Sequence, residues 1–142
     1  MRAQLLPAML CLTALVGCRC IADPLERPVP GLRVTPEEAH PSGIAVAQDT
    51  RIVFTVKNDR TLTLRELAAE LVDTSDPAFR LDEGFPDEVL PGQAIEIVVL
   101  VRPRVVSTIA ATLIITAQED AAPRSRVEVP ITVESIDAGM PD

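Results

Sequence analysis

Aromatic residues are almost missing from this sequence, which contains three phenylalanines and no tryptophan or tyrosine among its 142 residues. Sites that hold sugars or single-stranded nucleic acid usually stack the ligand on aromatic rings, so such a platform is disfavoured. Basic residues are also too few to balance the acidic ones. There are 13 lysines and arginines against 21 aspartates and glutamates, and the net charge is −8. A chain of this charge repels polyanions, and we therefore expect no nucleic-acid partner.

Cysteine and histidine are also sparse, and this limits the chemistry that the chain can carry. Cys11, Cys18 and Cys20 all lie near the N-terminus, so the body of the chain can form neither an internal disulfide nor a cysteine-ligated metal site. His40, the only histidine, lies in a loop, where a solvated side chain is the usual outcome. The acidic loop 82–88 could bind calcium weakly, but it lacks the spacing of an EF-hand. We therefore expect no catalytic residue, no metal, no cofactor and no enzymatic activity.

An apolar run near the N-terminus has the layout of a secretory signal peptide. Arg2 supplies a positive charge, and the apolar segment 5–16 follows it. A segment of about 12 residues is too short for a membrane-spanning helix, which needs roughly 20. A signal peptide is therefore the better interpretation of this run.

The end of the run resembles the lipobox of bacterial lipoproteins, at which a signal peptide is removed and the next cysteine receives a lipid. Leu15, Val16 and Gly17 match its branched, apolar and small positions, and Cys18 follows them. The resemblance implies that residues 1–17 are removed. It also implies that the sulfur of Cys18 carries a palmitate-type lipid, which would hold the protein at a membrane.

Two neighbouring residues bear on the final location of such a lipoprotein. Arg19 stands where lipoproteins retained in the inner membrane of Gram-negative bacteria have aspartate, and the resemblance therefore implies the outer membrane of the cell envelope. Cys20 could pair with a second copy or be acylated, or it could be a free thiol without a role. An ordinary secretory signal with a coincidental cysteine, or an uncleaved anchor, remains the alternative to a lipobox.

Composition divides the rest of the chain into three parts. Residues 18–30 contain three prolines and charged residues, which predicts a short, stiff tether. Residues 31–135 carry the alternation of apolar and polar positions that is typical of a folded β-domain. Residues 136–142 form a short acidic tail, which we expect to be disordered.

The domain alternates in short runs that proline- and glycine-containing turns separate. We expect strands at 32–34, 44–46, 51–57, 78–81, 94–102, 108–117 and 126–134. About seven short strands at roughly even spacing predict an all-β, immunoglobulin-like antiparallel sandwich of two sheets.

The stretch 61–73 fits two interpretations. Its leucines recur at a helical period, and Thr63 with Glu66 could form a capping box. As a strand, its alternation slips near Arg65 and Glu66, as it would at a β-bulge. We favour the strand because every neighbouring element is predicted to be a strand.

Two later strands carry unusual residues. Val98 and Leu100 give the strand 94–102 a second apolar face, which predicts that something covers it outside the core, such as a protein partner. Pro130 has no N–H to donate, so its strand should lie at a sheet edge or carry a bulge.

The order of these elements resembles that of ASH-type domains, the immunoglobulin-like family of abnormal spindle and hydin proteins. The matching motifs are Phe54-Thr55-Val56-Lys57-Asn58, Leu62-Thr63-Leu64, Phe79-Arg80-Leu81, Leu90-Pro91-Gly92, Thr112-Leu113-Ile114-Ile115-Thr116 and 127–133. The sequence departs from the pattern in three places: it lacks an early F-G element, it has Leu100 or Val101 where an aromatic is usual, and Asp59-Arg60 replaces a glycine.

The resemblance implies a non-catalytic binding or assembly module. Together with the lipobox, it predicts an envelope lipoprotein whose immunoglobulin-like domain binds or scaffolds envelope proteins that remain unidentified. The alternative is a periplasmic chaperone-like sandwich or an accessory of a secretion system. A chaperone would need a pair of basic residues in a cleft to hold the C-terminus of its partner, and the scattered arginines predict no such pair.

Overall fold

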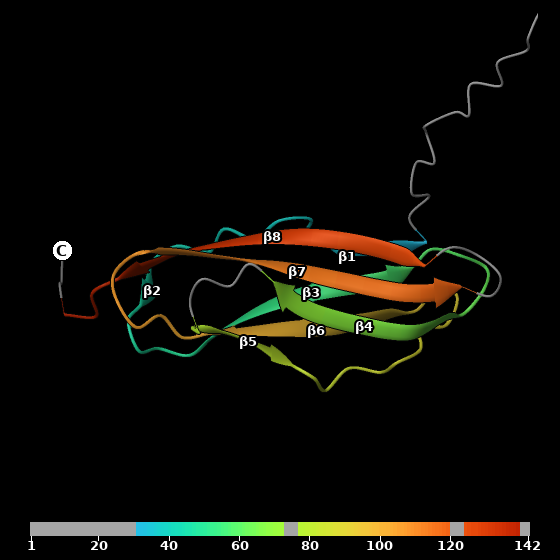
Figure 1. The fold of residues 1–142 in the computed structure, drawn as a ribbon, viewed down its shortest axis with the longest axis horizontal. Helices are drawn as coiled ribbons and strands as arrows, with labels where there is room; N and C mark the ends of the chain where they lie inside the picture. Colours follow the sequence, from blue (N-terminus) through green and yellow to red (C-terminus); the bar gives the residue numbers. More distant parts are fainter. Residues whose placement is uncertain (1–30, 73–76, 120–123, 140–142) are drawn as a thin grey trace, which may run out of the picture.

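A computed structural model describes residues 31–72, 77–119 and 124–139, which fold into two β-sheets packed face to face (Figure 1). The first sheet has the order β1 (Leu32–Thr35), β3 (Thr50–Asn58), β6 (Ala94–Val101), β5 (Phe79–Asp82), and all its pairs are antiparallel. The second has the order β2 (Ile44–Ala45), β8 (Ser125–Ile136), β7 (Thr108–Glu119), β4 (Leu64–Val72), in which only the short β2–β8 pair is parallel. The predicted sandwich is confirmed, with eight described strands.

Apolar side chains from the two inner faces form the core. In β3, for example, Ile52, Phe54 and Val56 are buried while the residues between them are exposed. Completely buried side chains come from both sheets, among them Phe54, Leu32, Leu64, Ile97, Leu113, Ile115 and Ile131. Burying one such side chain contributes about 1.5–3 kcal/mol. Since the body of the chain has no cysteine, this apolar contact is what stabilises the domain.

The ambiguous stretch is a strand with a bulge. β4 pairs with β7, and their register shifts between Arg65 and Ala68. Glu66 lies inside this shift with a φ of 50°, a left-handed conformation that no residue of a right-handed helix adopts. The extra residue lets Leu64 and Leu67 both turn toward the core, although three positions separate them. The strand interpretation is therefore confirmed, and the helical spacing of the leucines comes from the bulge.

Pro130 lies at the point where a neighbouring segment begins to cover β8 on the side away from β7, since Thr132 and Glu134 donate hydrogen bonds to the carbonyls of Ala39 and Pro41 on that side. The carbonyl of Pro130 accepts a hydrogen bond from the N–H of Ala39 (3.0 Å), and Ala39 forms only an isolated bridge with β8. β2 pairs with β8 only at Ser135 and Ile136. The carbonyl and the missing N–H of Pro130 both belong to the side away from β7, so no ladder hydrogen bond is lost. Among the described residues, the predicted edge position therefore holds only for the part of β8 before Pro130, because segment 39–45 covers residues 130–136.

The described chain enters the sandwich at one end and leaves it at the other (Figure 1). The carbonyl of Gly31, just before β1, accepts a hydrogen bond from the N–H of Asp59 (3.3 Å), just after β3. At the far end, Val46 donates to the carbonyl of Ile136 (3.0 Å), so β8 extends one residue into the expected tail. Residues 140–142 of that tail lie outside the described residues. Across the described ranges, the structure contains no helix of the length and hydropathy needed to cross a membrane.

Candidate functional site

The residues predicted to carry the lipid lie outside the described residues. Leu15, Val16, Gly17 and Cys18 belong to residues 1–30, as do the expected signal peptide and tether. The structure gives these residues no geometry, so their assignment rests on the sequence motif.

Val98 and Leu100 lie side by side on the outer face of the β1-β3-β6-β5 sheet. Val98 is only 8% exposed although it is not part of the core, and Leu100 is half-buried. Val98 stands in register with Val53 of β3 and with Asp82 of β5, so neighbouring side chains of its own sheet surround it. The apolar contact surface that the sequence predicts here is therefore small, and Val53, 40% exposed, is its most accessible part.

The two polar features singled out in the sequence are solvent-exposed. The Nε2 atom of His40 lies 3.4 Å from the Oε2 atom of Glu38, and both side chains are largely exposed. Within the acidic loop, Asp82 accepts a hydrogen bond from the backbone of Gly84, and Glu88 forms an ion pair with Arg65. In the described ranges, no three acidic, histidine or cysteine side chains are grouped in a way that could hold a metal ion.

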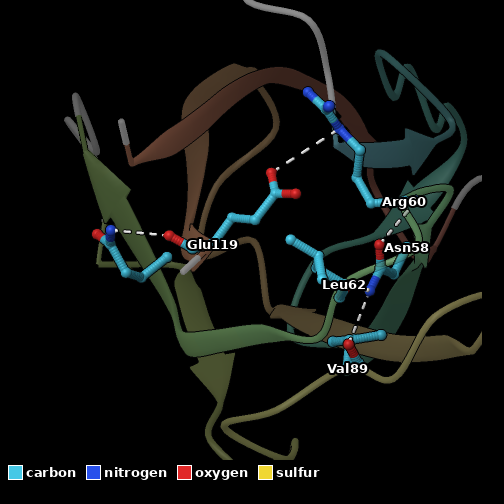
Figure 2. Close-up of polar contacts among 6 residues, drawn as sticks. Asn58, Arg60, Leu62, Val89 and Glu119 are labelled. Atoms are coloured by element: carbon cyan, nitrogen blue, oxygen red, sulfur yellow. Dashed lines mark hydrogen bonds and ion pairs between the residues drawn. The ribbon is translucent and has the colours of Figure 1, made fainter. Parts of the chain in front are cut away.

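A buried polar network closes the end of the sandwich where β3 finishes (Figure 2). The side chain of Asn58 is completely buried. Its Nδ2 atom donates to the carbonyls of Leu62 and Val89, both at 2.9 Å, and its Oδ1 atom accepts from the N–H of Arg60 at 2.9 Å. Asn58 thereby joins three segments: the end of β3, the approach to β4 and the approach to β6.

An ion pair lies beside this network. The Nε atom of Arg60 is 3.9 Å from the Oε2 atom of Glu119, which is 8% exposed although it is charged (Figure 2). Arg60 also packs against Gly31, where a Cβ atom would lie 2.9 Å from the Arg60 side chain. The Arg60–Glu119 pair therefore occupies the point at which the chain enters the domain.

Asp59, next to this pair, titrates below its ordinary range. A hydrogen bond from the Nζ atom of Lys57 to its Oδ1 atom (2.8 Å) lowers the pKa of Asp59 below 3.8, and the charges of Lys57 and Arg33 act in the same direction. The sequence motif contained Lys57 and Asn58, but it gave no sign of these contacts.

One long strand edge lacks a neighbour along half of its length. β4 is the last strand of its sheet. Its first half is covered, because Leu64 exchanges two hydrogen bonds with Val89 and Leu67 donates to the carbonyl of Asp87 (2.9 Å). Backbone groups alternate in direction along a strand, so the N–H and C=O groups of Ala69 and Leu71 point the same way as those of Leu67. In the part of the chain that the structure describes, no segment pairs with Ala69 or Leu71 on that side.

The inner face of this free edge is incompletely covered. β4 and β5 are the edge strands on the same side of the sandwich and contact each other across it. Ala69 and Leu71 of β4, Leu81 of β5 and Phe85 of the following loop pack against the core but remain partly exposed. These four residues form an apolar strip, called the β4–β5 seam below.

The outer face of the same sheet has a shallow cleft of about 500 Å³ over β4, β7 and β8. The residues that line it include Glu70, Ile114, Arg124 and Arg126. Both arginines are engaged in ion pairs, Arg124 with Glu66 (2.6 Å) and Arg126 with Glu128 (2.8 Å). The cleft therefore does not present a free basic pair.

Comparison with known proteins identifies the fold. No protein-family model matches the chain, and no curated protein does. The PapD-like domain 7 of human CEP192 has a TM-score of 0.64 at 12% identity, over 78% of this chain and 89% of that chain. The Vibrio cholerae VesB protease matches with a TM-score of 0.59 at 13% identity, over 74% of this chain and 32% of the protease chain. A chain of the CsuC–CsuE chaperone–tip subunit pre-assembly complex of Acinetobacter baumannii matches with a TM-score of 0.57 at 8% identity. The match covers 78% of this chain and 61% of that chain.

At these identities the likeness concerns the fold alone. The protein spans about a third of the protease chain and less than two thirds of the chaperone-complex chain. The shared architecture occurs in a human PapD-like domain, in part of a protease and in a chaperone assembly, so the architecture by itself does not fix a function.

Proposed function

Because the chain has an ASH/PapD-like immunoglobulin fold, we propose that it is a non-catalytic protein-binding or scaffold module of the bacterial cell envelope. The observation that carries this proposal is the likeness to a sandwich found in a chaperone–subunit complex, where such a domain accompanies a protein partner. The proposal that the chain is not an enzyme rests on composition, with a single histidine and no cysteine after residue 20.

The proposal includes an anchor, a lipid on Cys18 that holds the protein at the envelope, with the outer membrane as its place. The lipobox motif and the proline-containing segment after it support this arrangement. An anchor before residue 31 would connect to one end of the sandwich, where the described chain begins, and would leave the other end of the sandwich accessible to a partner (Figure 1).

A chaperone-like or secretion-accessory role is the second candidate, and the same structural neighbour favours it. The two candidates differ in what they do with a partner, because a scaffold retains it whereas a chaperone releases it. A basic pair in a cleft would favour the chaperone, but Arg124 and Arg126 are paired with glutamates and Arg60 lies beside Glu119. The scaffold is therefore the function that we favour.

The test is cross-linking of the full chain in living bacteria, followed by affinity capture and mass spectrometry. We expect an N-terminal peptide that begins at lipid-modified Cys18, and a small set of envelope proteins linked to the domain. The matched control is Phe54→Asp, which places a charge at a completely buried position, leaves the anchor unchanged and should lose these partners. A chain that keeps residues 1–17 would overturn the anchor. Partners that cross-link equally to Phe54→Asp would overturn the binding module.

A further inference from the structure

We propose that the free edge of β4, residues 68–72, binds an extended segment of a partner protein as an added β-strand that covers the β4–β5 seam and places a basic side chain beside Glu70. The proposal rests on the proposed binding function and deepens it, because it names the surface and the chemistry of the partner.

The backbone of β4 supplies the hydrogen-bonding groups. The first half of the strand shows how such an edge is completed in this protein, because Leu64 and Val89 exchange hydrogen bonds at 3.0 and 2.9 Å. Beyond Leu67 this cover ends, while the strand continues to Val72. A partner strand that continues the line of residues 87–89 would reach the N–H and C=O groups of Ala69 and Leu71. Strand addition to an exposed sheet edge is an established mode of peptide recognition.

Most of the usual devices that protect an edge are missing from this half of β4. Proteins block free edges with proline, lysine, bulges or very short strands. The bulge of β4 lies at Glu66, before the free half, and residues 68–72 contain neither proline nor lysine. Glu70 is their single charged residue, which makes this edge selective for a partner of opposite charge. By contrast, the edge strands of the other sheet, β1 and β5, are only four residues long.

The seam determines which side chains the added strand should carry. Alternate residues of a strand point to opposite faces, so every second residue of the partner would lie over Ala69, Leu71 and Leu81. Those three side chains are apolar and partly exposed, and apolar partner residues would remove them from water. The partner segment should therefore alternate between apolar residues and polar ones.

Charge determines the polar residues and argues against a second copy of this chain. Glu70 is exposed on the outer face of the free edge, where it lines the same cleft as Arg124 and Arg126. Both arginines form their ion pairs with other residues, Glu66 and Glu128. Asp87 lies beside Leu67, at the point where the existing cover ends. A basic residue of the partner is thus favoured next to Glu70. Two copies paired edge to edge would bring two such acidic strands, each from a chain of net charge −8, against one another.

The test uses the purified full chain in detergent and a fluorescein-labelled peptide, Lys-Val-Thr-Val-Lys-Val-Thr, with anisotropy as the readout. We expect Ala69→Pro, which removes an outward N–H, to weaken binding by about tenfold or more.

Glu70→Lys should weaken binding similarly and should transfer the preference to a peptide with glutamate in place of lysine. The matched control is Glu96→Lys, the same charge change on the exposed face of β6, and it should leave binding within about twofold.

A peptide methylated on alternate backbone nitrogens keeps the side chains but loses the ladder hydrogen bonds, and it should not bind. This control uses the unchanged protein, so it decides the question even if Ala69→Pro fails to fold. Equal binding of the methylated peptide, or an unchanged preference in Glu70→Lys, would overturn the proposal. A full chain that is dimeric, and becomes monomeric in Ala69→Pro, would assign the edge to a second copy and overturn it as well. If Ala69→Pro keeps its cross-linked envelope partners, the edge proposal fails while the binding function stands.

Discussion

Asn58 is the residue on which the entry end of the domain depends. Replacing it with alanine removes both donors to the carbonyls of Leu62 and Val89 and the acceptor for the N–H of Arg60. Each buried group left without a partner costs about 1–3 kcal/mol, so Asn58→Ala should lower the free energy of unfolding by about 3 kcal/mol or more. Urea denaturation followed by circular dichroism measures this loss.

Leu62→Ala is the matched control, because the backbone carbonyl that accepts from Asn58 remains and the side chain lost is 48% exposed. It should change the free energy of unfolding by less than about 1 kcal/mol. A similarly small loss in Asn58→Ala would show that water replaces the network.

Asp59 links the stability of the same end to pH. Its pKa is lower in the folded chain than the unfolded value of 3.8, chiefly because Lys57 donates a hydrogen bond to it. The carboxylate therefore stabilises the fold above that value, and the contribution is lost as the pH falls through the folded pKa. Asp59→Asn should have a lower urea midpoint than the natural chain at pH 6, and the difference should shrink below pH 3.8. A difference independent of pH would show that the charge of Asp59 is not its cause.

Single residues were the least predictable level. Asn58 was visible in the sequence as part of a motif, but its partner Val89 lies 31 residues away. Glu119 and Arg60 meet because β7 and the β3–β4 connection end at the same pole of the sandwich. Contacts between such distant positions follow from the sheet order, which local patterns do not contain.

Among the elements, β4 is the one in which a substitution can distinguish a bulged strand from a helix. Glu66 has a positive φ in the bulge, where glycine is favoured over alanine by about 1 kcal/mol. In a helix the preference would be reversed by about the same amount. Both substitutions remove the exposed pair with Arg124 equally. We therefore expect Glu66→Gly to be more stable than Glu66→Ala in thermal unfolding, and the opposite order would contradict the bulge.

Elements were predictable where alternation was regular. β3 and β8 show the apolar face that period-two alternation indicated. Pro130 marked the point at which the cover on one side of β8 begins, and not a strand at the edge of its sheet. In the stretch 61–73 the bulge gave the leucines a helical spacing, so periodicity alone could not distinguish a strand from a helix. The prediction of a strand depended on the strands expected on either side. The exposure of Val98 was not predictable, because it depends on Val53 and Asp82 of the adjoining strands.

For the molecule as a whole, the sequence was sufficient for a two-sheet sandwich but not for its sheet order. The alternation identified which faces are buried, whereas the neighbours of each strand depend on the path of the chain through space. The free half of β4 is a consequence of that order, since β4 is the last strand of its sheet. No feature of residues 68–72 distinguishes them from a strand with two neighbours.

The anchor is also a property of the whole chain, and it can be tested without knowing the partner. Cells grown with labelled palmitate should incorporate the label into the natural protein and into Cys20→Ser, but not into Cys18→Ser. The reason is that the thiol of residue 18 follows the lipobox, whereas that of residue 20 does not. Intact mass spectrometry checks the same point. Label that persists in Cys18→Ser, or is lost in Cys20→Ser, would rule out Cys18 as the attachment site.

The two ends of the described chain lie at opposite poles of the sandwich, and this has a mechanical consequence (Figure 1). A pull between the segment before β1 and the end of β8 acts along the strands, because Leu32 begins β1 at one pole and Ile136 ends β8 at the other. Force in this direction loads in shear the hydrogen bonds of β1 with β3 and those of β8 with β7, so the bonds of each pair resist together instead of opening one after another. Tension transmitted from one pole to the other is therefore carried by these two strand pairs.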